Sequence, residues 1–308
     1  MVYHEILVPI SFYALLFGIF CSTSFIIVLF LTRKSRKVEG YGFALGQNCI
    51  IDIIFASFCA VNRYDILALK GYSIYGITAV DFEIPSTFIK ISIMGMFYTA
   101  NMTFYVVGIP FYVRYLKICK KIDLHWTKIA LLYLVPFVYE IFAIYFVYSA
   151  YEVNPPELEE LKMRPQFFPN TTGRFWNFAA AKLNSTDIYI AFVIINFGCI
   201  FSYSAAIYFN RKVLKHLNHD YMMEPLKTQY KNLQFTMIVQ TTAQAFMIVL
   251  PCFALWLTTF LEFKYCMIFG MLLEFAPAVT SISTMLSVPD YRQKIKNTYN
   301  SLIDLVSL

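Results

Sequence analysis

The chain has 308 residues, of which 59% are apolar or aromatic and only 14% are charged, whereas soluble proteins average about 45–50% and about 25%. This hydrophobicity excludes a disordered chain, 11 Gly exclude collagen, and the length together with 7 Cys excludes a small disulfide-stapled secreted module. What remains is a protein that crosses a membrane several times.

Seven apolar stretches are long enough to cross a bilayer, for which a helix needs roughly 20 residues. In chain order they span residues 6–31, 41–61, 88–113, 129–151, 188–209, 235–261 and 266–288. The first is uncharged and much longer than the apolar core of a signal peptide, so we expect it to be retained as the first helix. The pattern predicts an all-α membrane protein, in which residues 1–308 form a single seven-helix bundle.

The basic residues are distributed unequally between the two sides of this bundle. The loops after the first, third and fifth segments, together with the tail, carry 17 of the 25 Lys and Arg residues, and the other side carries 8. Because cytosolic loops are the ones enriched in Lys and Arg, we expect an extracellular N-terminus. The net charge of +6 then reflects contact with an anionic lipid leaflet and not with nucleic acid.

The long loop between the fourth and fifth segments carries two glycosylation sequons, which begin at Asn170 and Asn184. Both lie on the side predicted to be extracellular. In the same loop, residues 174–182 are predicted to form a short amphipathic segment over the bundle. At the other end of the chain, residues 291–306 predict a helix that lies along the inner membrane surface.

The sequence holds no zinc-protease pair of histidines, no phosphate-binding glycine loop and no nucleophile elbow. His216 and His219 are one helical turn apart, but they lack a third ligand. We therefore expect neither an enzyme nor a metal or cofactor site. The cysteines are interpreted as small buried apolar residues, with a Cys59–Cys266 pair as the alternative.

Three acidic residues fall inside the apolar segments. A charge at the centre of a spanning helix costs about 2.5–3.5 kcal/mol on insertion scales, so such residues usually face the interior and serve a function. Asp52, one turn after Asn48, predicts an interior polar network. Glu274 predicts a ligand cavity, with Lys90 as a candidate partner, and Glu140 is interpreted as a neutral acid that packs between helices.

Four prolines lie inside predicted helices, at positions 110, 136, 251 and 277. Each removes a backbone donor and tends to kink its helix. One interpretation is that they only shape the helices. The other is that Pro251 and Pro277 form a pair of hinges.

Four short strings occur in order along the chain. They are the basic stretch from Thr32 to Gly40-Tyr41, Phe111-Tyr112-Val113-Arg114-Tyr115-Leu116, Leu233-Gln234 followed by Val239-Gln240-Thr241 and Pro251, and Pro289-Asp290-Tyr291-Arg292. Their order and spacing resemble those of the nematode serpentine chemoreceptors of the Str superfamily, a group of G-protein-coupled receptors that includes the Str, Srj and Srd classes. The resemblance extends over nearly the whole chain.

This resemblance implies a chemosensory receptor in the plasma membrane of sensory-neuron cilia. It would bind a small-molecule odorant or pheromone in an outer cavity and activate a heterotrimeric G protein in the cytosol. Arg114 and Tyr115 would lie at the G-protein-facing end of the third helix, and Tyr291 and Arg292 at the junction after the seventh. The candidates for the cavity lining are Tyr98, Asn101, Met102, Gln244, Met247, Trp256 and Glu274.

The chain departs from the family pattern in three places. Gln244 stands where relatives often have a proline, and Thr280-Ser281 replaces an Asp/Asn-Pro pair. No cysteine is available for the usual bridge between the third helix and the second outer loop. These differences leave the ligand class and the details of activation open.

Two other functions fit a polytopic membrane protein. A ligand-gated channel of the insect odorant-receptor type needs its N-terminus in the cytosol, which the distribution of basic residues opposes. A secondary transporter that uses Asp52, Glu140 and Glu274 normally shows internal repeats, and the sequence shows none.

Overall fold

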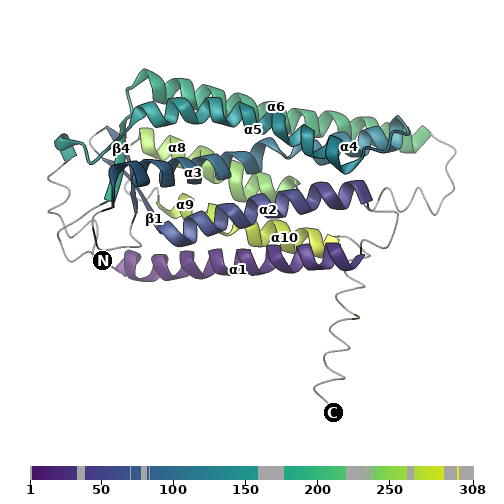
Figure 1. The fold of residues 1–308 in the computed structure, drawn as a ribbon, viewed down its shortest axis with the longest axis horizontal. Coiled ribbons are helices and arrows are strands. Elements are labelled where there is room, and N and C mark those ends of the chain that lie inside the picture. Colours follow the sequence, from purple (N-terminus) through teal and green to yellow (C-terminus); the bar gives the residue numbers. More distant parts are fainter. Residues whose placement is uncertain are drawn as a thin grey trace, which may run out of the picture.

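A computed structural model describes residues 2–32, 39–69, 71–77, 82, 84–158, 177–219, 231, 235, 238–239, 241–261, 267–287 and 297. The helices run roughly along one long axis, and a small sheet covers one end of the bundle (Figure 1). We call this the sheet end. The opposite end, where α6 carries Arg211, Lys212 and Lys215, is called the basic end.

Four long helices make up much of the bundle: α1 (Val2–Thr32), α2 (Glu39–Asn62), α5 (Trp126–Ala150) and α6 (Thr186–His219). Three of them, α1, α5 and α6, are long and apolar enough to cross a membrane, with mean hydropathies of 2.3, 2.0 and 2.0. The predicted segments 6–31, 129–151 and 188–209 fall on these helices. At 34 residues, α6 measures about 51 Å at 1.5 Å per residue, so it extends well beyond a bilayer core of about 30 Å.

The remaining helices are interrupted close to prolines. The third predicted segment consists of α3 (Ser86–Tyr105) and α4 (Gly108–Cys119), and the seventh of α9 (Met267–Glu274) and α10 (Ala276–Ser287). Within the sixth, a π-helical turn (η2, Ala245–Val249) precedes α8 (Leu250–Phe260).

A proline has no N–H to donate to the carbonyl four residues before it. For Pro110, Pro251 and Pro277, that carbonyl belongs to a residue within the irregular segment or at most two residues from it. Pro136, in contrast, leaves α5 continuous.

The sheet was not predicted from the sequence, and the expectation of an all-α chain is wrong in this respect. It consists of β1 (Tyr64–Leu69), β2 (Tyr72–Ile77), β3 (Tyr151–Val153) and β4 (Asn177–Lys182), all antiparallel, in the order β1-β2-β4-β3. Gly71, with a φ of 74°, lies in the turn between β1 and β2, where glycine adopts a positive φ without strain.

Part of the predicted amphipathic segment 174–182 is thus the strand β4. Ala179, Ala180 and Ala181 favour a helix by intrinsic propensity. In the structure, these three residues pair with β2 on one side and with β3 on the other. This pairing buries them almost completely. Tertiary pairing therefore overrides local preference at this position.

Aromatic rings fasten the sheet to the helices. The Tyr75 ring centroid lies 4.9 Å from that of Phe97 on α3 and 5.7 Å from that of Tyr151. Asn177 joins β4 to the preceding connection, because its amide donates to the Phe82 carbonyl (2.8 Å) and accepts from the Ile84 N–H (2.9 Å). The sheet therefore closes this end of the bundle.

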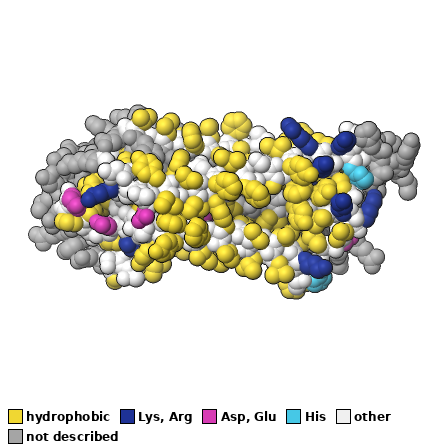
Figure 2. Space-filling view, turned by 90° about the horizontal axis from the view of Figure 1, so that it is seen from above, with side chains coloured by type: hydrophobic (Ala, Val, Ile, Leu, Met, Phe, Trp, Pro, Cys, Tyr) yellow, Lys and Arg dark blue, Asp and Glu magenta, His cyan; other side chains and the backbone are white. Residues whose placement is uncertain are grey.

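On the face seen in Figure 2, apolar side chains cover the middle of the molecule, while charged side chains gather towards its two ends. Large exposed apolar side chains on α5 and α6 contribute to the apolar surface: Leu131, Leu134, Val135, Val138, Ile141, Phe142, Val193, Phe197, Ile200 and Phe201. So much apolar surface is unstable in water and is typical of contact with lipid.

Candidate ligand-binding site

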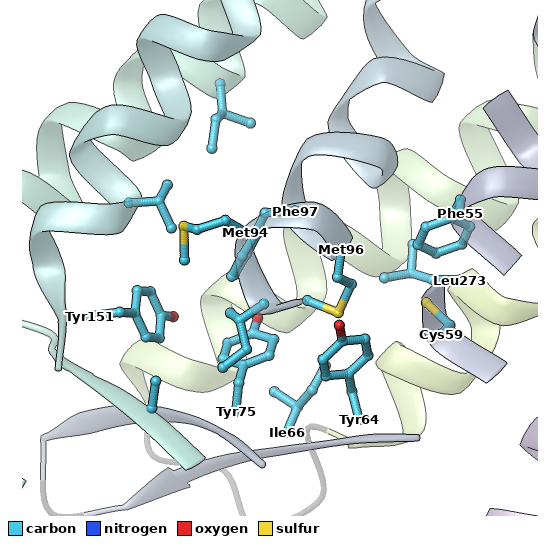
Figure 3. Packing of buried hydrophobic residues seen from close by; sticks show 14 of the residues in the cluster. Phe55, Cys59, Tyr64, Ile66, Tyr75, Met94, Met96, Phe97, Tyr151 and Leu273 are labelled. Atoms are coloured by element: carbon cyan, nitrogen blue, oxygen red, sulfur yellow. The ribbon is translucent and has the colours of Figure 1, made fainter. Parts of the chain in front are cut away.

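A cavity of about 60 Å³ lies between the sheet and the helices. Tyr64, Ile66 and Tyr75 rise from β1 and β2 towards Met96 and Phe97 on α3 (Figure 3). The complete lining comes from the sheet and six helices: Ser11, Phe55, Cys59, Tyr64, Ile66, Tyr75, Met96, Phe97, Ala100, Asn101, Ile195, Cys252, Gly270, Leu273 and Glu274. The cavity is therefore mostly apolar and aromatic, with a few polar groups.

The wall formed by β1 is held by hydrogen bonds to α2 and α3. The Tyr64 hydroxyl donates to the Ser92 carbonyl (2.6 Å), and the Ser92 hydroxyl donates to the Asn62 side-chain oxygen (2.6 Å). Burial raises the pKa of Tyr64, so its hydroxyl remains protonated and acts as a donor. The strand is thus fixed to the bundle from inside the cavity.

Glu274, the last residue of α9, forms the acidic part of the lining. It is half-buried and accepts a hydrogen bond from the Ser11 hydroxyl on α1. The predicted pairing with Lys90 is not formed. The Lys90 ammonium lies 4.2 Å from the centroid of the Tyr148 ring on α5 and donates to the Tyr148 carbonyl (3.2 Å).

Asn101 connects the cavity to a second intramembrane acid. Its amide donates to Glu140 on α5 over 2.8 Å, and Glu140 is completely buried. The Tyr105 hydroxyl lies beside the same carboxyl group, and the Tyr105 ring packs edge-on against Tyr139 at 5.4 Å. The Tyr139 hydroxyl donates to the Ile194 carbonyl on α6 (2.5 Å). Glu140 thus lies within polar contacts that link α3, α5 and α6.

Of the predicted lining residues, Asn101 and Glu274 line the cavity and Tyr98 and Met102 do not. The Tyr98 ring packs edge-on against Phe137 of α5 at 5.4 Å, and Met102 packs with Ile129 and Tyr133. Gln244 is buried at the start of η2, and Met247 packs against the central core without lining the cavity. The side chain of Trp256 lies outside the described residues.

Sequence reasoning missed Ser11 and the sheet residues Tyr64, Ile66 and Tyr75. Residues 64–77 lie in a connection between two apolar segments, where no strand is predicted. The alternation of apolar residues at 64, 66 and 68 was the available signal, since these three side chains are buried and period-two alternation is typical of a strand.

Asn48 and Asp52 take part in an interior polar network farther from the sheet. The Thr280 hydroxyl on α10 donates to the Asp52 carboxyl group (3.1 Å), and the Tyr133 hydroxyl donates to the Asn48 side-chain oxygen (2.9 Å). The neighbouring hydroxyls of Ser22 and Ser281 share a hydrogen bond of 2.8 Å. This network joins α1, α2, α5 and α10.

The sequence profile of one protein family, described as serpentine type 7TM GPCR chemoreceptor Str, matches residues 9–296. The chain belongs to this family. No individual curated protein matches it. The receptor is accordingly a membrane protein of a chemosensory class, and this class is generally not enzymatic.

At the basic end of the receptor, α4 packs against the extended part of α6. Arg114 is buried, with only 4% of its surface exposed. The Tyr115 ring lies 5.2 Å from the Phe209 ring of α6. Tyr291, Arg292, Asn170 and the predicted tail helix 291–306, apart from Asn297, lie outside the described residues.

The remaining sequence-based expectations concern Asn184 and the cysteines. Asn184 is exposed in the turn between β4 and α6. Cys59 is a free, buried thiol in the cavity lining, while Cys266 lies outside the described residues. Among the residues that the structure describes, no group of three or more His, Cys, Asp or Glu could hold a metal ion.

Proposed function

We propose that the receptor binds a small odorant or pheromone in the cavity beneath the sheet and, in response, activates a heterotrimeric G protein at the basic end. The observation that carries the proposal is the cavity itself, which combines an apolar lining with Asn101 and Glu274. Small-molecule sites have this composition, with a few polar groups that fix the orientation of the ligand. Membership of a chemoreceptor family supports it.

The proposed receptor crosses the plasma membrane of a sensory cilium seven times. In addition to α1, α2, α5 and α6, the three remaining crossings correspond to α3 with α4, to the helix that contains η2 and α8, and to α9 with α10. The excess of basic residues beyond the basic end supports a cytosolic position for that end, and the sheet end is then extracellular. Asn170 and Asn184 would be glycosylated there.

Activation is proposed to be a population shift, in which the ligand binds better to the active arrangement of the helices. The irregular backbone near Pro251 and Pro277 gives the two hinges, and the Asp52 network connects α10, next to the second hinge, to α1, α2 and α5. The residues proposed to contact the G protein or to control its activation are Arg114, Tyr115, Tyr291 and Arg292. Ligand contacts are assigned to Asn101 and Glu274. Gln244, Met247 and Trp256 lie on the helix that would move, and they are proposed to respond to the ligand through that movement.

The cavity assignment is tested by a variant that fills it. Ala100→Phe places a ring in the lining, whereas Ile91→Phe places one on the exposed side of the same helix. Cells that express each form are screened with an odorant panel and a second-messenger readout. We expect responses from the wild type and from Ile91→Phe, and none from Ala100→Phe at equal surface expression. Equal responses from Ala100→Phe would contradict the assignment.

Topology is tested separately by mapping glycosylation. Replacement of Asn184 by Gln should remove one glycan from the protein made in cells, because the exposed turn after β4 is accessible to the transferase. An intact receptor that carries no glycan at either Asn170 or Asn184 would argue against an extracellular sheet end.

A further inference from the structure

The acidic side of the cavity coincides with the end of a helix. Glu274 is the last residue of α9, and a turn at Phe275 separates it from α10, which begins at Ala276. The C-terminal end of a helix carries partial negative charge. Here it lies together with the carboxyl group of Glu274, so two negative features occupy the same position.

Pro277 strengthens this effect. In a continuous helix, the N–H at position 277 would donate to the carbonyl of Leu273, but proline has no N–H. Leu273 and Glu274 both line the cavity. The interruption after α9 thus places the carboxyl group of Glu274, at the C-terminal end of that helix, beside the space that a ligand would occupy. Ends of interrupted membrane helices stabilise cations in this way.

The rest of the lining suits an organic cation. The rings of Phe55, Tyr64, Tyr75 and Phe97 line the cavity, and the faces of aromatic rings attract ammonium groups. Among the described lining residues, Glu274 is the one with an acidic side chain, and none is Lys, Arg or His. The Ser11 hydroxyl, which donates to Glu274, fixes the orientation of the carboxyl group.

We propose that the ligand of this cavity is a small aliphatic amine, bound in its protonated form with the ammonium group at Glu274 and the hydrocarbon part against the aromatic rings. This inference rests on the proposed function of the cavity and specifies its ligand class. A free metal cation fits less well, because most of the lining is apolar carbon and cannot replace a hydration shell.

The test uses three compounds with the same carbon skeleton, namely 3-methylbutylamine, 3-methylbutanol and 3-methylbutanoic acid. The purified full-length receptor is heated with each at increasing concentration, and the apparent Tm reports binding. We expect the amine to raise the Tm at the lowest concentration, the alcohol to require at least tenfold more, and the acid to have no effect.

Three variants locate the effect. Glu274→Gln should weaken binding of the amine at least tenfold and leave binding of the alcohol unchanged. Glu152→Gln, which removes an exposed carboxyl group on β3 at the same end of the receptor, should bind the amine like the wild type. If Glu274→Gln does not fold, Ser11→Ala takes its place. Ser11→Ala removes the hydroxyl that donates to Glu274, and it should weaken binding of the amine by a smaller, measurable factor.

The possible failures are distinguishable. Equal binding of amine and alcohol, or an amine effect that survives Glu274→Gln, overturns the ligand class and leaves the cavity assignment intact. The same holds if none of the three compounds stabilises the wild type. Amine binding that persists in Ala100→Phe overturns the cavity assignment, and the proposed ligand class fails with it.

Discussion

The side-chain amide of Asn101 on α3 donates a hydrogen bond of 2.8 Å to the carboxyl group of Glu140 on α5. Asn101 also lines the cavity, so a single residue borders the space for a ligand and holds a completely buried acid. A change in the position of α3 at the cavity must therefore be followed by Glu140 or must break this bond. The pair connects the cavity wall to the next helix.

Replacement of Asn101 by Leu should destabilise the receptor by about 1–3 kcal/mol, because it leaves a buried carboxyl group without its amide donor. The measurement is the apparent Tm of the purified protein. The double variant Asn101→Leu/Glu140→Leu removes both polar partners and should recover most of the loss, since an apolar pair in their place is nearly neutral. A double variant no more stable than Asn101→Leu would show that the bond is not the cause.

Gly198 on α6 allows two tyrosine rings to approach the helix backbone. A Cβ at this position would lie 2.6 Å from the Tyr139 ring and 2.7 Å from the Tyr105 ring. Gly198→Ala should therefore cost about 1–3 kcal/mol through overpacking, measured by thermal unfolding. Gly46→Ala is the matched control, because among the described residues its Cβ would meet Leu29 alone, at an ordinary 3.7 Å. A loss of stability at both positions would indicate a general intolerance of alanine instead.

Ser202 on α6 satisfies the backbone where α3 and α4 separate. Its hydroxyl donates to the Tyr105 carbonyl (2.9 Å) and accepts from the Gly108 N–H (3.1 Å). Ser202→Ala leaves two buried backbone groups without this partner and should cost about 1–3 kcal/mol. Ser204→Ala removes an exposed hydroxyl from the same helix and should stay within about 0.5 kcal/mol of the wild type. Equal melting temperatures for the two variants would contradict the role of Ser202.

The helices could be predicted from the sequence because a bilayer requires long apolar segments, and α1, α5 and α6 meet this requirement by composition alone. The sheet could not, because its central pairing, between β2 and β4, joins residues at least 100 positions apart. The alanines of β4 pair with residues 73–75 of β2, and no local pattern encodes such a partner. The apolar pattern therefore predicts no regular structure between the segments 41–61 and 88–113.

The residues of the candidate site could likewise be predicted from the sequence only in part. Asn101 and Glu274 were identifiable because polar groups are rare and costly within apolar helices. Tyr98 and Met102 were placed in the lining from position along the helix, but rotation about the helix axis depends on packing with α5, which the sequence does not specify. Tyr64 and Tyr75 reach the cavity only because the sheet folds over it. The pattern of apolar segments, which predicts helices, therefore gives no indication of these two lining residues.

Pro277 lies beside the interruption between α9 and α10, which is one of the two proposed hinges. In Pro277→Ala, the restored N–H can bond the carbonyl of Leu273 and join α9 to α10. This favours a continuous helix by about 3 kcal/mol, which corresponds to more than a hundredfold change in an equilibrium. If the interruption acts as a hinge, the maximal second-messenger response should fall severalfold at unchanged surface expression. Pro136→Ala is the matched control, because α5 is already continuous at that proline, and its response should equal that of the wild type. A full response from Pro277→Ala would show that the interruption only shapes the helix.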